Sequence, residues 1–312
     1  MPAGRPALRR AAPPRTCGNT EHTASGCPFM TDVLRYTAFS TDPAGGNRAG
    51  VVLDAAGLSA ERMAAIAADV GYSETAFLTP GPADEAGAGR SFTARYFSPA
   101  AEVPFCGHAT VATAVALAER LGAGDFALHT RPGRVPVAVT EADGVLKATL
   151  SSVEPHVREA AAADVAEALA ALRWSAAELD PALPPRIAFA GAHHLVLAAA
   201  TRARLADLDY DFGRLRALME RLDLTTVQLV WRESPAVFHV RDPFPVGGVV
   251  EDAATGAAAA AFGAYARELG LAAGQDRLTL HQGHDMGSPS LLEVELRAGD
   301  PRVHVTGAAV RL

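Results

Sequence analysis

The hydrophobic and polar positions of the chain follow two different periods, which predicts short strands interspersed with a few helices. Over residues 59–71, apolar side chains recur at the i, i+3, i+4, i+7 spacing of a helix with one buried face. Ser59 can cap this helix and Gly71 can end it. Two further amphipathic helices are predicted over residues 157–172 and 211–222.

Two other predicted helices, 109–121 and 256–269, are apolar or small on nearly all sides until their last turn. A helix of this kind must be surrounded by protein, and its alanines allow a sheet to wrap closely around it. Each follows a short glycine-containing motif, Cys-Gly-His-Ala-Thr at 106–110 and Asp-Ala-Ala-Thr-Gly at 252–256. The motifs lie about half the chain apart, which indicates two copies of one structural plan.

The predicted strands are spread over both halves of the chain. Those of the first half cover residues 34–40, 51–53, 73–78, 91–97 and 126–129. Those of the second half cover residues 137–140, 146–150, 187–197, 226–231, 236–241, 277–281, 291–296 and 303–306. About a dozen strands with one buried helix in each half predict an α+β fold of two lobes, and a cleft between lobes is the expected place for a site.

Charge and composition narrow the class of protein. The 312 residues carry 28 Lys and Arg against 35 Asp and Glu, a net charge of −7, so no positive field exists to attract nucleic acid. The longest apolar runs are far shorter than the ~20 residues of a membrane helix. Three cysteines, Cys17, Cys27 and Cys106, cannot form a disulfide framework, which favours a reducing, cytoplasmic location.

The first 29 residues form a separate segment. They are rich in proline and arginine and lack the apolar stretch of a secretory signal. Such a segment cannot bury enough surface to fold, and Met30 stands directly before the first strand pattern. We therefore expect residues 1–29 to be a disordered leader.

Glu74 is the first candidate for chemistry. On the predicted strand it shares the more apolar face with Ala76 and Leu78, so its carboxyl should point inward. Because burial disfavours the charged form of a carboxyl, an inward glutamate is suited to proton transfer. A paired glutamate at a strand edge is the structural alternative.

The start of the first buried helix is the second candidate site. Gly107 permits close backbone approach there, and the free N–H groups of a helix start attract an anion. Cys106 and His108 flank this glycine, and each alone could be a packing or capping residue. No second Cys or His at zinc-ligand spacing is found beside Cys106, and His193 and His194 point to opposite faces of a strand, so we expect no metal site.

The start of the second buried helix offers Glu251 and Asp252, whose carboxylates the helix dipole favours. Capping alone could account for Asp252. The Gly247-Gly248 pair before them lacks the lysine and the spacing of a phosphate-binding loop.

Taken together, these motifs resemble the phenazine-biosynthesis PhzF-like family, whose relatives are diaminopimelate epimerase and proline racemase. The resemblance covers essentially Met30 to the C-terminus. It rests on Gly46-Asn47 with Ala49–Val52, Ser73–Phe77, Arg95–Pro99, Glu102–Thr110, Glu251–Gly256, and Gln282-Gly283 with Met286-Gly287.

The resemblance implies two similar lobes, each a curved sheet or barrel around a central helix, and a homodimer without cofactor or metal. It implies an N-terminal lobe of residues 30–131 plus about 300–312 and a C-terminal lobe of residues 132–299. Glu74, His108 and Asp252 would be catalytic, with Glu74 moving the proton. The substrate would be a small carboxylate bound by Asn47, Cys106, Gly107, Ala109, Thr255, Gly256 and Ala257.

Two departures from the family pattern matter. The family often has serine after Thr-Gly, where this chain has Ala257, so one hydroxyl contact is missing. Epimerases of the superfamily place a cysteine at each helix start, whereas this chain has Cys106 and Ala253. We therefore expect an isomerase similar to trans-2,3-dihydro-3-hydroxyanthranilate isomerase. An epimerase or racemase of an amino-acid-like substrate and a non-catalytic metabolite-binding protein are the alternatives.

Overall fold

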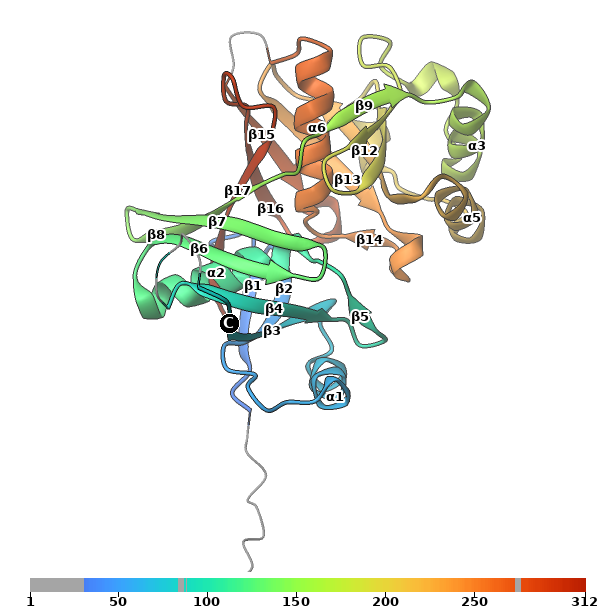
Figure 1. The fold of residues 1–312 in the computed structure, drawn as a ribbon. Coiled ribbons are helices and arrows are strands. Elements are labelled where there is room, and N and C mark those ends of the chain that lie inside the picture. The colour runs from blue at the N-terminus through green and yellow to red at the C-terminus, as the bar shows by residue number, and fades with distance from the viewer. Residues whose placement is uncertain (1–30, 84–86, 88, 273–275) are drawn as a thin grey trace, which may run out of the picture. The chain divides into compact units, whose positions relative to one another are not determined.

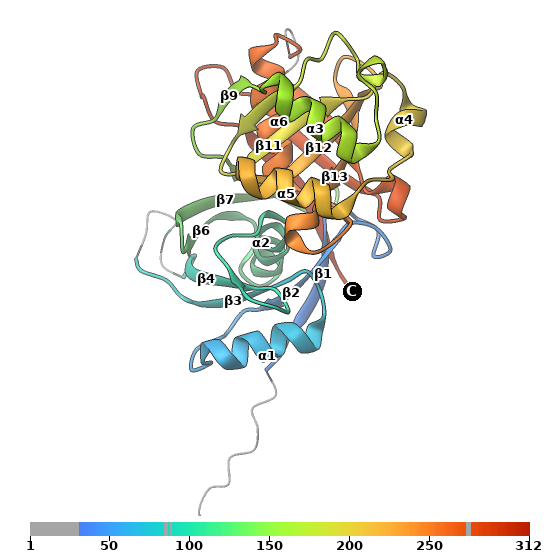
Figure 2. The same ribbon diagram turned by 90° about the vertical axis from the view of Figure 1, so that its right-hand side faces the viewer.

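Helix α2 (Gly107–Leu121) lies at the centre of the first lobe of the computed structural model. Every side chain from His108 to Ala118 is buried, as the apolar sequence on all sides of the helix requires. Eight strands close into a barrel around it, and Figure 2 shows α2 nearly end-on inside this ring. The strands, in the order in which they pair around the barrel, are β1 (Leu34–Ala38), β2 (Asn47–Val52), β3 (Glu74–Pro80), β4 (Ser91–Phe97), β6 (Gly124–Thr130), β7 (Gly133–Ala142), β8 (Val145–Ser151) and β17 (His304–Arg311), which returns to β1.

Helix α6 (Gly256–Glu268) has the same position in the second lobe, with buried residues from Ala258 to Ala266. A curved sheet surrounds it, as the upper half of Figure 1 shows. Its strands, in pairing order, are β9 (His156–Glu159), β10 (Arg186–Phe189), β11 (His193–Ala198), β12 (Leu224–Arg232), β13 (Val237–Pro243), β15 (Arg277–Gln282), β16 (Ser290–Glu295) and β17. Two short strands, β5 (Glu102–Val103) and β14 (Glu251–Asp252), precede α2 and α6 and pair antiparallel with the ends of β4 and β13.

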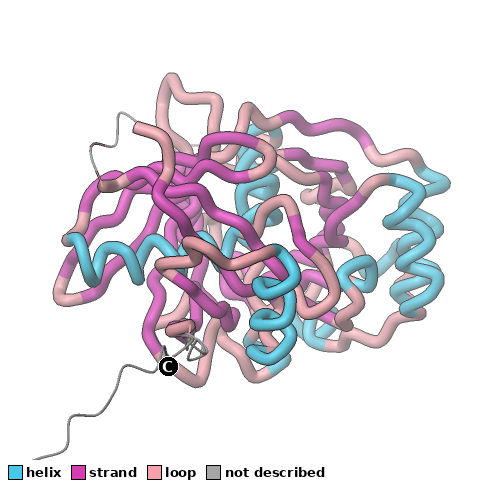
Figure 3. The backbone as a smooth tube through the Cα atoms, turned by 60° about the horizontal axis from the view of Figure 1, so that its bottom comes forward, coloured by secondary structure: helices cyan, strands magenta, loops and turns pink. Residues whose placement is uncertain are grey.

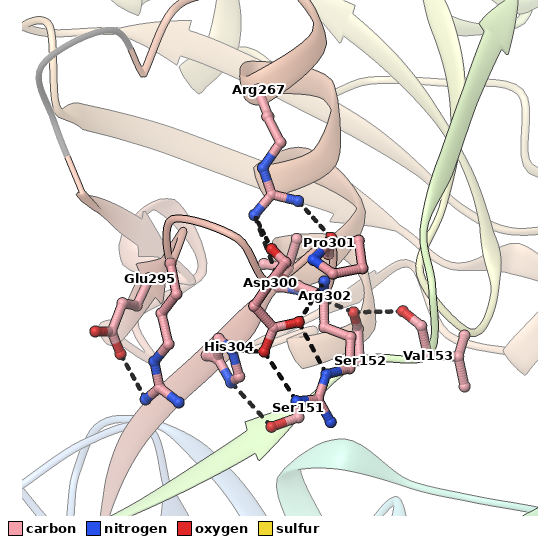
Figure 4. Close-up of polar contacts among 11 residues, drawn as sticks. Ser151, Ser152, Val153, Arg267, Glu295, Asp300, Pro301, Arg302 and His304 are labelled. Atoms are coloured by element: carbon pink, nitrogen blue, oxygen red, sulfur yellow. Dashed lines mark hydrogen bonds and ion pairs between the residues drawn. The ribbon is translucent and has the colours of Figure 1, made fainter.

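The lobes are joined by two segments that cross between them. The first segment leads from β8, which pairs with β7 of the first lobe, to β9 of the second lobe. The second segment is β17, which pairs with β16 of the second lobe at one end and with β1 of the first lobe at the other. The two segments also pair with each other where they cross. Figure 4 shows the polar contacts there, including Ser151 Oγ at 2.9 Å from Nδ1 of the buried His304.

The remaining helices lie outside the strands, and Figure 3 shows helices both within and beside the strand layers. Helix α1 (Ala60–Val70) covers β3, while α3 (Ala162–Leu172), α4 (Arg202–Ala206) and α5 (Phe212–Leu222) cover the outer face of the second sheet. As predicted, Ser59 accepts a hydrogen bond from the N–H of Arg62, and Gly71 ends α1 in the left-handed conformation. Short 3-10 turns cover residues Ala176–Glu178, Pro245–Gly247 and His284–Met286.

The structure describes residues 31–83, 87, 89–272 and 276–312, and the predicted leader 1–29 lies outside them. Asp32–Leu312 form one compact unit. The mixed α+β architecture with a closed barrel confirms the predicted fold class. Within the described residues, every helix is too short or too polar to cross a membrane.

Three details differ from the sequence predictions. The predicted helix 157–172 is a strand, β9, followed by α3, and the predicted strand 187–197 is the hairpin of β10 and β11. Gly191 forms the turn of this hairpin with a φ of 117°. Because the residues around it are mostly apolar, the sequence pattern predicted one continuous strand there. Strands β7 and β8 pair with β6 and β17 and pack on α2, so the first lobe extends beyond the expected boundary at residue 131.

The close fit of sheet to helix gives a prediction for Gly263 of α6. A Cβ at this position would lie 2.6 Å from Cγ1 of Val303 and 2.8 Å from Cγ1 of Val294. Gly263→Ala should therefore destabilise the protein by ~1–3 kcal/mol through overpacking, measured by urea unfolding. Gly213→Ala in α5 is the control, because the nearest atom to its Cβ is at 3.7 Å, and it should stabilise by up to ~1 kcal/mol. Equal effects of the two changes would contradict the packing described here.

Candidate functional site

The two buried helices begin close to each other at the junction of the lobes. A Cβ on Gly107 would lie 3.8 Å from Cα of Gly256, so the two helix starts meet with no side chain between them. The N-cap residues Cys106 and Thr255 make no capping hydrogen bond to their helices. Two helix starts of this kind present N–H groups and positive dipole ends, which favour an anion.

Asn47, the first residue of β2, connects the lobes through its buried side chain. Its Nδ2 donates to Oδ1 of Asp252 at 2.7 Å and to the carbonyl oxygen of Ala254 at 3.2 Å, and it lies 3.2 Å from Nδ1 of His108. The two N–H groups of this amide are both used on the two oxygens. Because Oε2 of Glu74, an acceptor, lies 3.4 Å from Nε2 of His108, we place the proton of a neutral His108 on Nε2.

Nε2 of His108 faces the side chains at the start of β3. It lies 3.2 Å from Oγ of Ser73 and 3.4 Å from Oε2 of Glu74. Glu74 shares its strand face with Ala76 and Leu78, which are part of the core around α2, and its side chain is 17% exposed. The prediction that the Glu74 carboxyl points inward is confirmed.

Cys106 completes this group. Its Sγ donates to Oε2 of Glu74 at 3.5 Å and lies 3.3 Å from Nδ1 of His108. Burial raises the pKa of the Cys106 thiol well above its ordinary value, and the negative charge of Glu74 raises it further. Cys106 is therefore a protonated thiol that hydrogen-bonds to Glu74.

Asp252 lies on the second-lobe side of the junction. Its Oδ2 accepts from Oγ1 of Thr255 at 2.7 Å, and Gln282 donates from Nε2 to the Asp252 carbonyl oxygen at 2.8 Å and to Oγ1 of Thr255 at 2.9 Å. With Asn47 on Oδ1, both carboxylate oxygens have a donor. Burial raises the pKa of Asp252, as does the charge of Glu74, while His108, Thr255 and Asn47 oppose the rise.

The structure also brings together three potential metal ligands. One atom each of Glu74, Cys106 and His108 lies within 4.8 Å of the others, and carboxylate, thiol and imidazole are the groups that bind zinc. The spacing argument that excluded a metal considered neighbours along the chain. It could not detect Glu74, which comes from a different strand.

The other predicted binding residues all lie on the two helix starts. Gly107, Gly256 and Ala257 are partly exposed at the junction. Ala109 is fully buried in the core of the first lobe, so only its backbone can face a ligand. The structure thus gathers the predicted residues in one place, and their roles in binding stay predictions.

Sequence reasoning missed three contributors to the site. Ser73 and Gln282 belong to motifs that carry the family resemblance but are not among the predicted site residues, although they contact His108 and Asp252. The third is the buried ion pair of Arg241 with Glu251, at 2.9 and 2.5 Å, which anchors β14 directly beside Asp252. No local pattern in the sequence indicates that these two side chains meet.

Known proteins are similar to this chain over most of its length. The family model of the phenazine biosynthesis-like proteins, PhzC-PhzF, matches residues 36–312. An uncharacterized isomerase of Deinococcus radiodurans is 34% identical over 290 residues, which cover 88% of this chain and 89% of the relative. Trans-2,3-dihydro-3-hydroxyanthranilate isomerase of Pseudomonas aeruginosa is 32% identical over 269 residues, covering 85% and 90%.

Solved structures show the same fold. That of a predicted epimerase from Pseudomonas aeruginosa has a TM-score of 0.77 at 29% identity and covers 90% of this chain and 96% of its own. A probable proline racemase from Agrobacterium radiobacter has a TM-score of 0.58 at 14% identity, covering 90% of each chain, which is a likeness of fold alone.

The contacts of Asn47 give a prediction about pH. Asn47→Leu removes a donor to the charged form of Asp252, so the pKa of Asp252 should rise further and the acid limb of activity should move to higher pH. A hydrogen bond to a charged group contributes ~1.5–3 kcal/mol, so activity on that limb should fall roughly tenfold or more. A carbon-13 NMR titration of the Asp252 carboxyl measures the shift directly. Ser73→Ala, which removes a contact of His108 only, should leave that titration in place; an unmoved titration in Asn47→Leu would contradict the role of the amide.

Proposed function

The chain belongs to the phenazine biosynthesis-like PhzC-PhzF family and is an isomerase, and from this premise we propose that it moves a proton, and with it a double bond, within a small carboxylated metabolite. The observation that carries the proposal is the position of Glu74. Its Oε2 is held by Cys106 at 3.5 Å and His108 at 3.4 Å, beside two helix starts suited to a carboxylate.

The proposed reaction needs a single base. The helix starts at Gly107 and Gly256 hold the substrate carboxylate and keep its carbon skeleton beside Glu74. Glu74 takes a proton from one carbon and returns it to another on the same side, while the double bond shifts between them. The Nε2–H of His108 orients the Glu74 carboxylate. No atom is gained or lost, so the substrate and the product are isomers.

The contact of Cys106 with Glu74 distinguishes this reaction from epimerisation. An epimerase with two bases must approach one carbon from opposite sides. Sγ of Cys106 and Oε2 of Glu74 are 3.5 Å apart and hydrogen-bonded, so both reach the same side of a substrate. The second helix start has Ala253 where another thiol would be needed. These features favour an isomerase over the epimerase alternative.

The proposed mechanism uses no cofactor or metal. Glu74, Cys106 and His108 could together bind a metal ion, but an ion there would occupy the Glu74 oxygen that takes the proton. Metal binding by these three residues and proton transfer by Glu74 therefore exclude each other.

The relatives named as trans-2,3-dihydro-3-hydroxyanthranilate isomerases support a similar substrate for this chain. Ala257 in place of the serine common in the family removes one hydroxyl from the second helix start. We propose that the substrate is related to this compound. A homodimeric, cytoplasmic enzyme is part of the same proposal.

Replacement of the base tests the proposal. Glu74→Gln keeps the size of the side chain but cannot accept the proton, so turnover should fall ~10²-fold or more while the fold and ligand binding persist. Proton NMR in deuterated water, with trans-2,3-dihydro-3-hydroxyanthranilate as substrate, follows both the double-bond shift and the deuterium incorporated. Glu293→Gln is the control, because Glu293 pairs with Lys147 away from the site. Near-normal turnover in Glu74→Gln would exclude Glu74 as the base.

Replacement of the thiol separates the two enzyme classes. With one base on one side of the substrate, Cys106 only hydrogen-bonds to Glu74, and Cys106→Ser supplies a hydroxyl for the same contact. This variant should retain most of the activity. If Cys106 were the second base of an epimerase, the same change would nearly abolish turnover with the fold intact, as circular dichroism would show.

A further inference from the structure

A row of polar side chains crosses the inner face of the second sheet and ends at Asp252. It consists of His194 on β11, Thr226 and Gln228 on β12, and Asp242 on β13, all with 0% exposure. His194 pairs in register with Thr226, and Asp242 pairs with Asp252. Their neighbours on the same strand faces belong to the apolar core around α6. The row is therefore a polar strip in an apolar wall that starts at the candidate site.

The hydrogen bonds within the row satisfy only part of it. Oγ1 of Thr226 donates to Oδ1 of Asp242 at 2.7 Å and lies 2.8 Å from Nδ1 of His194. Because the single hydroxyl proton is used on Asp242, His194 donates from Nδ1 and keeps a lone pair on Nε2.

Four atoms of the row have no partner. They are Nε2 of His194, Oε1 and Nε2 of Gln228, and Oδ2 of Asp242. Gln228 lies near Asp242, but no hydrogen bond of normal geometry joins them. Unpartnered buried polar groups cost stability, and apolar side chains would fill the same wall without that cost. A purely structural role does not explain four such atoms on three adjacent strands.

Burial disfavours the charged forms of the two titratable groups of the row. Burial raises the pKa of Asp242 well above its ordinary value, and the nearby charges of Asp252 and Glu251 raise it further, although Thr226 and Gln228 oppose the rise. Burial also lowers the pKa of His194 to about 3, with the neighbouring His193 adding to the effect. The charge of Glu251 is itself paired with Arg241. The row thus offers hydrogen-bond donors and acceptors in surroundings that disfavour charge.

We propose that His194, Gln228 and Asp242 form a second recognition subsite, which binds an amino or hydroxyl group of the substrate remote from its carboxylate. This inference rests on the proposed function. The group would donate an N–H or O–H to Nε2 of His194 or Oε1 of Gln228 and accept from Nε2 of Gln228. Asp252, which pairs with Asp242 and is partly exposed at the junction, connects the row to the candidate site.

The test uses benzoate and its ortho and meta derivatives with amino, hydroxyl or methyl groups as probes, with affinities from calorimetry on the full chain. The wild-type protein should bind amino or hydroxyl derivatives at least tenfold more tightly than the methyl derivative of the same position. The amino and hydroxyl series show which donor is preferred. Gln228→Leu and Asp242→Leu should reduce this preference to less than twofold and leave the affinity for the methyl derivatives unchanged.

Two further variants guard against an effect of folding. Asp242→Asn keeps the size and the hydrogen-bonding groups of the side chain, so this variant should keep the preference for amino or hydroxyl derivatives. Loss of the preference in Asp242→Leu but not in Asp242→Asn would show that it depends on hydrogen bonding. Thr113→Val is the matched control, because it removes a buried hydroxyl in α2 that also has no partner. It should not change the preference.

The outcomes separate the two proposals. If the wild-type protein binds the carboxylates without preferring a donor, or if the preference survives in both leucine variants, the subsite assignment is wrong and the proposed function stands. If no probe carboxylate binds to the wild-type protein, the anion site of the proposed function fails, and the subsite that rests on it fails as well.

Discussion

The approach of two helix starts is the constraint on which the rest of the structure depends. Gly107 and Gly256 meet at van der Waals distance, because a Cβ on Gly107 would lie 3.8 Å from Cα of Gly256, and no side chain lies between the two helix starts. Each helix is held there by a sheet wrapped around its alanine-rich body. The positive ends of the two helix dipoles repel each other where the helices meet. Negative charge close to both helix starts therefore stabilises the arrangement. The fold thus favours negative charge at this junction, where the carboxylates of Glu74 and Asp252 lie.

Asn47 and Asp252 show how the two lobes are kept in this arrangement. The amide of Asn47 extends from the first lobe to Asp252 and Ala254 of the second, and also contacts His108. The amide that joins the lobes therefore also lies against His108, whose Nε2 is 3.4 Å from Oε2 of Glu74. If Glu74 is the base, as we propose, one amide connects the arrangement of the lobes with the surroundings of the base.

The sequence predicted the parts of the fold that local patterns determine. The buried helices were evident because their apolar residues cover all sides, and Glu74 because it shares a strand face with Ala76 and Leu78. The pairing of β7 and β8 with the first lobe depends on contacts with β17, at the opposite end of the chain. The buried pair of Arg241 with Glu251 and the polar row behind Asp252 likewise depend on the register of neighbouring strands, which no short segment reveals.

The two lobes repeat one plan, but their helix starts are chemically different. The first has a thiol, an imidazole and a glutamate within hydrogen-bonding distance, and the second has a carboxylate held by Asn47 and Thr255. A symmetric pair of thiols would suit removal of a proton from one side of a carbon and its return from the other. This chain has Ala253 in place of a second thiol, so in the proposed function the base lies on the first lobe alone and acts on one side of the substrate. In that proposal, different side chains on a repeated backbone plan replace inversion of a centre by movement of a double bond.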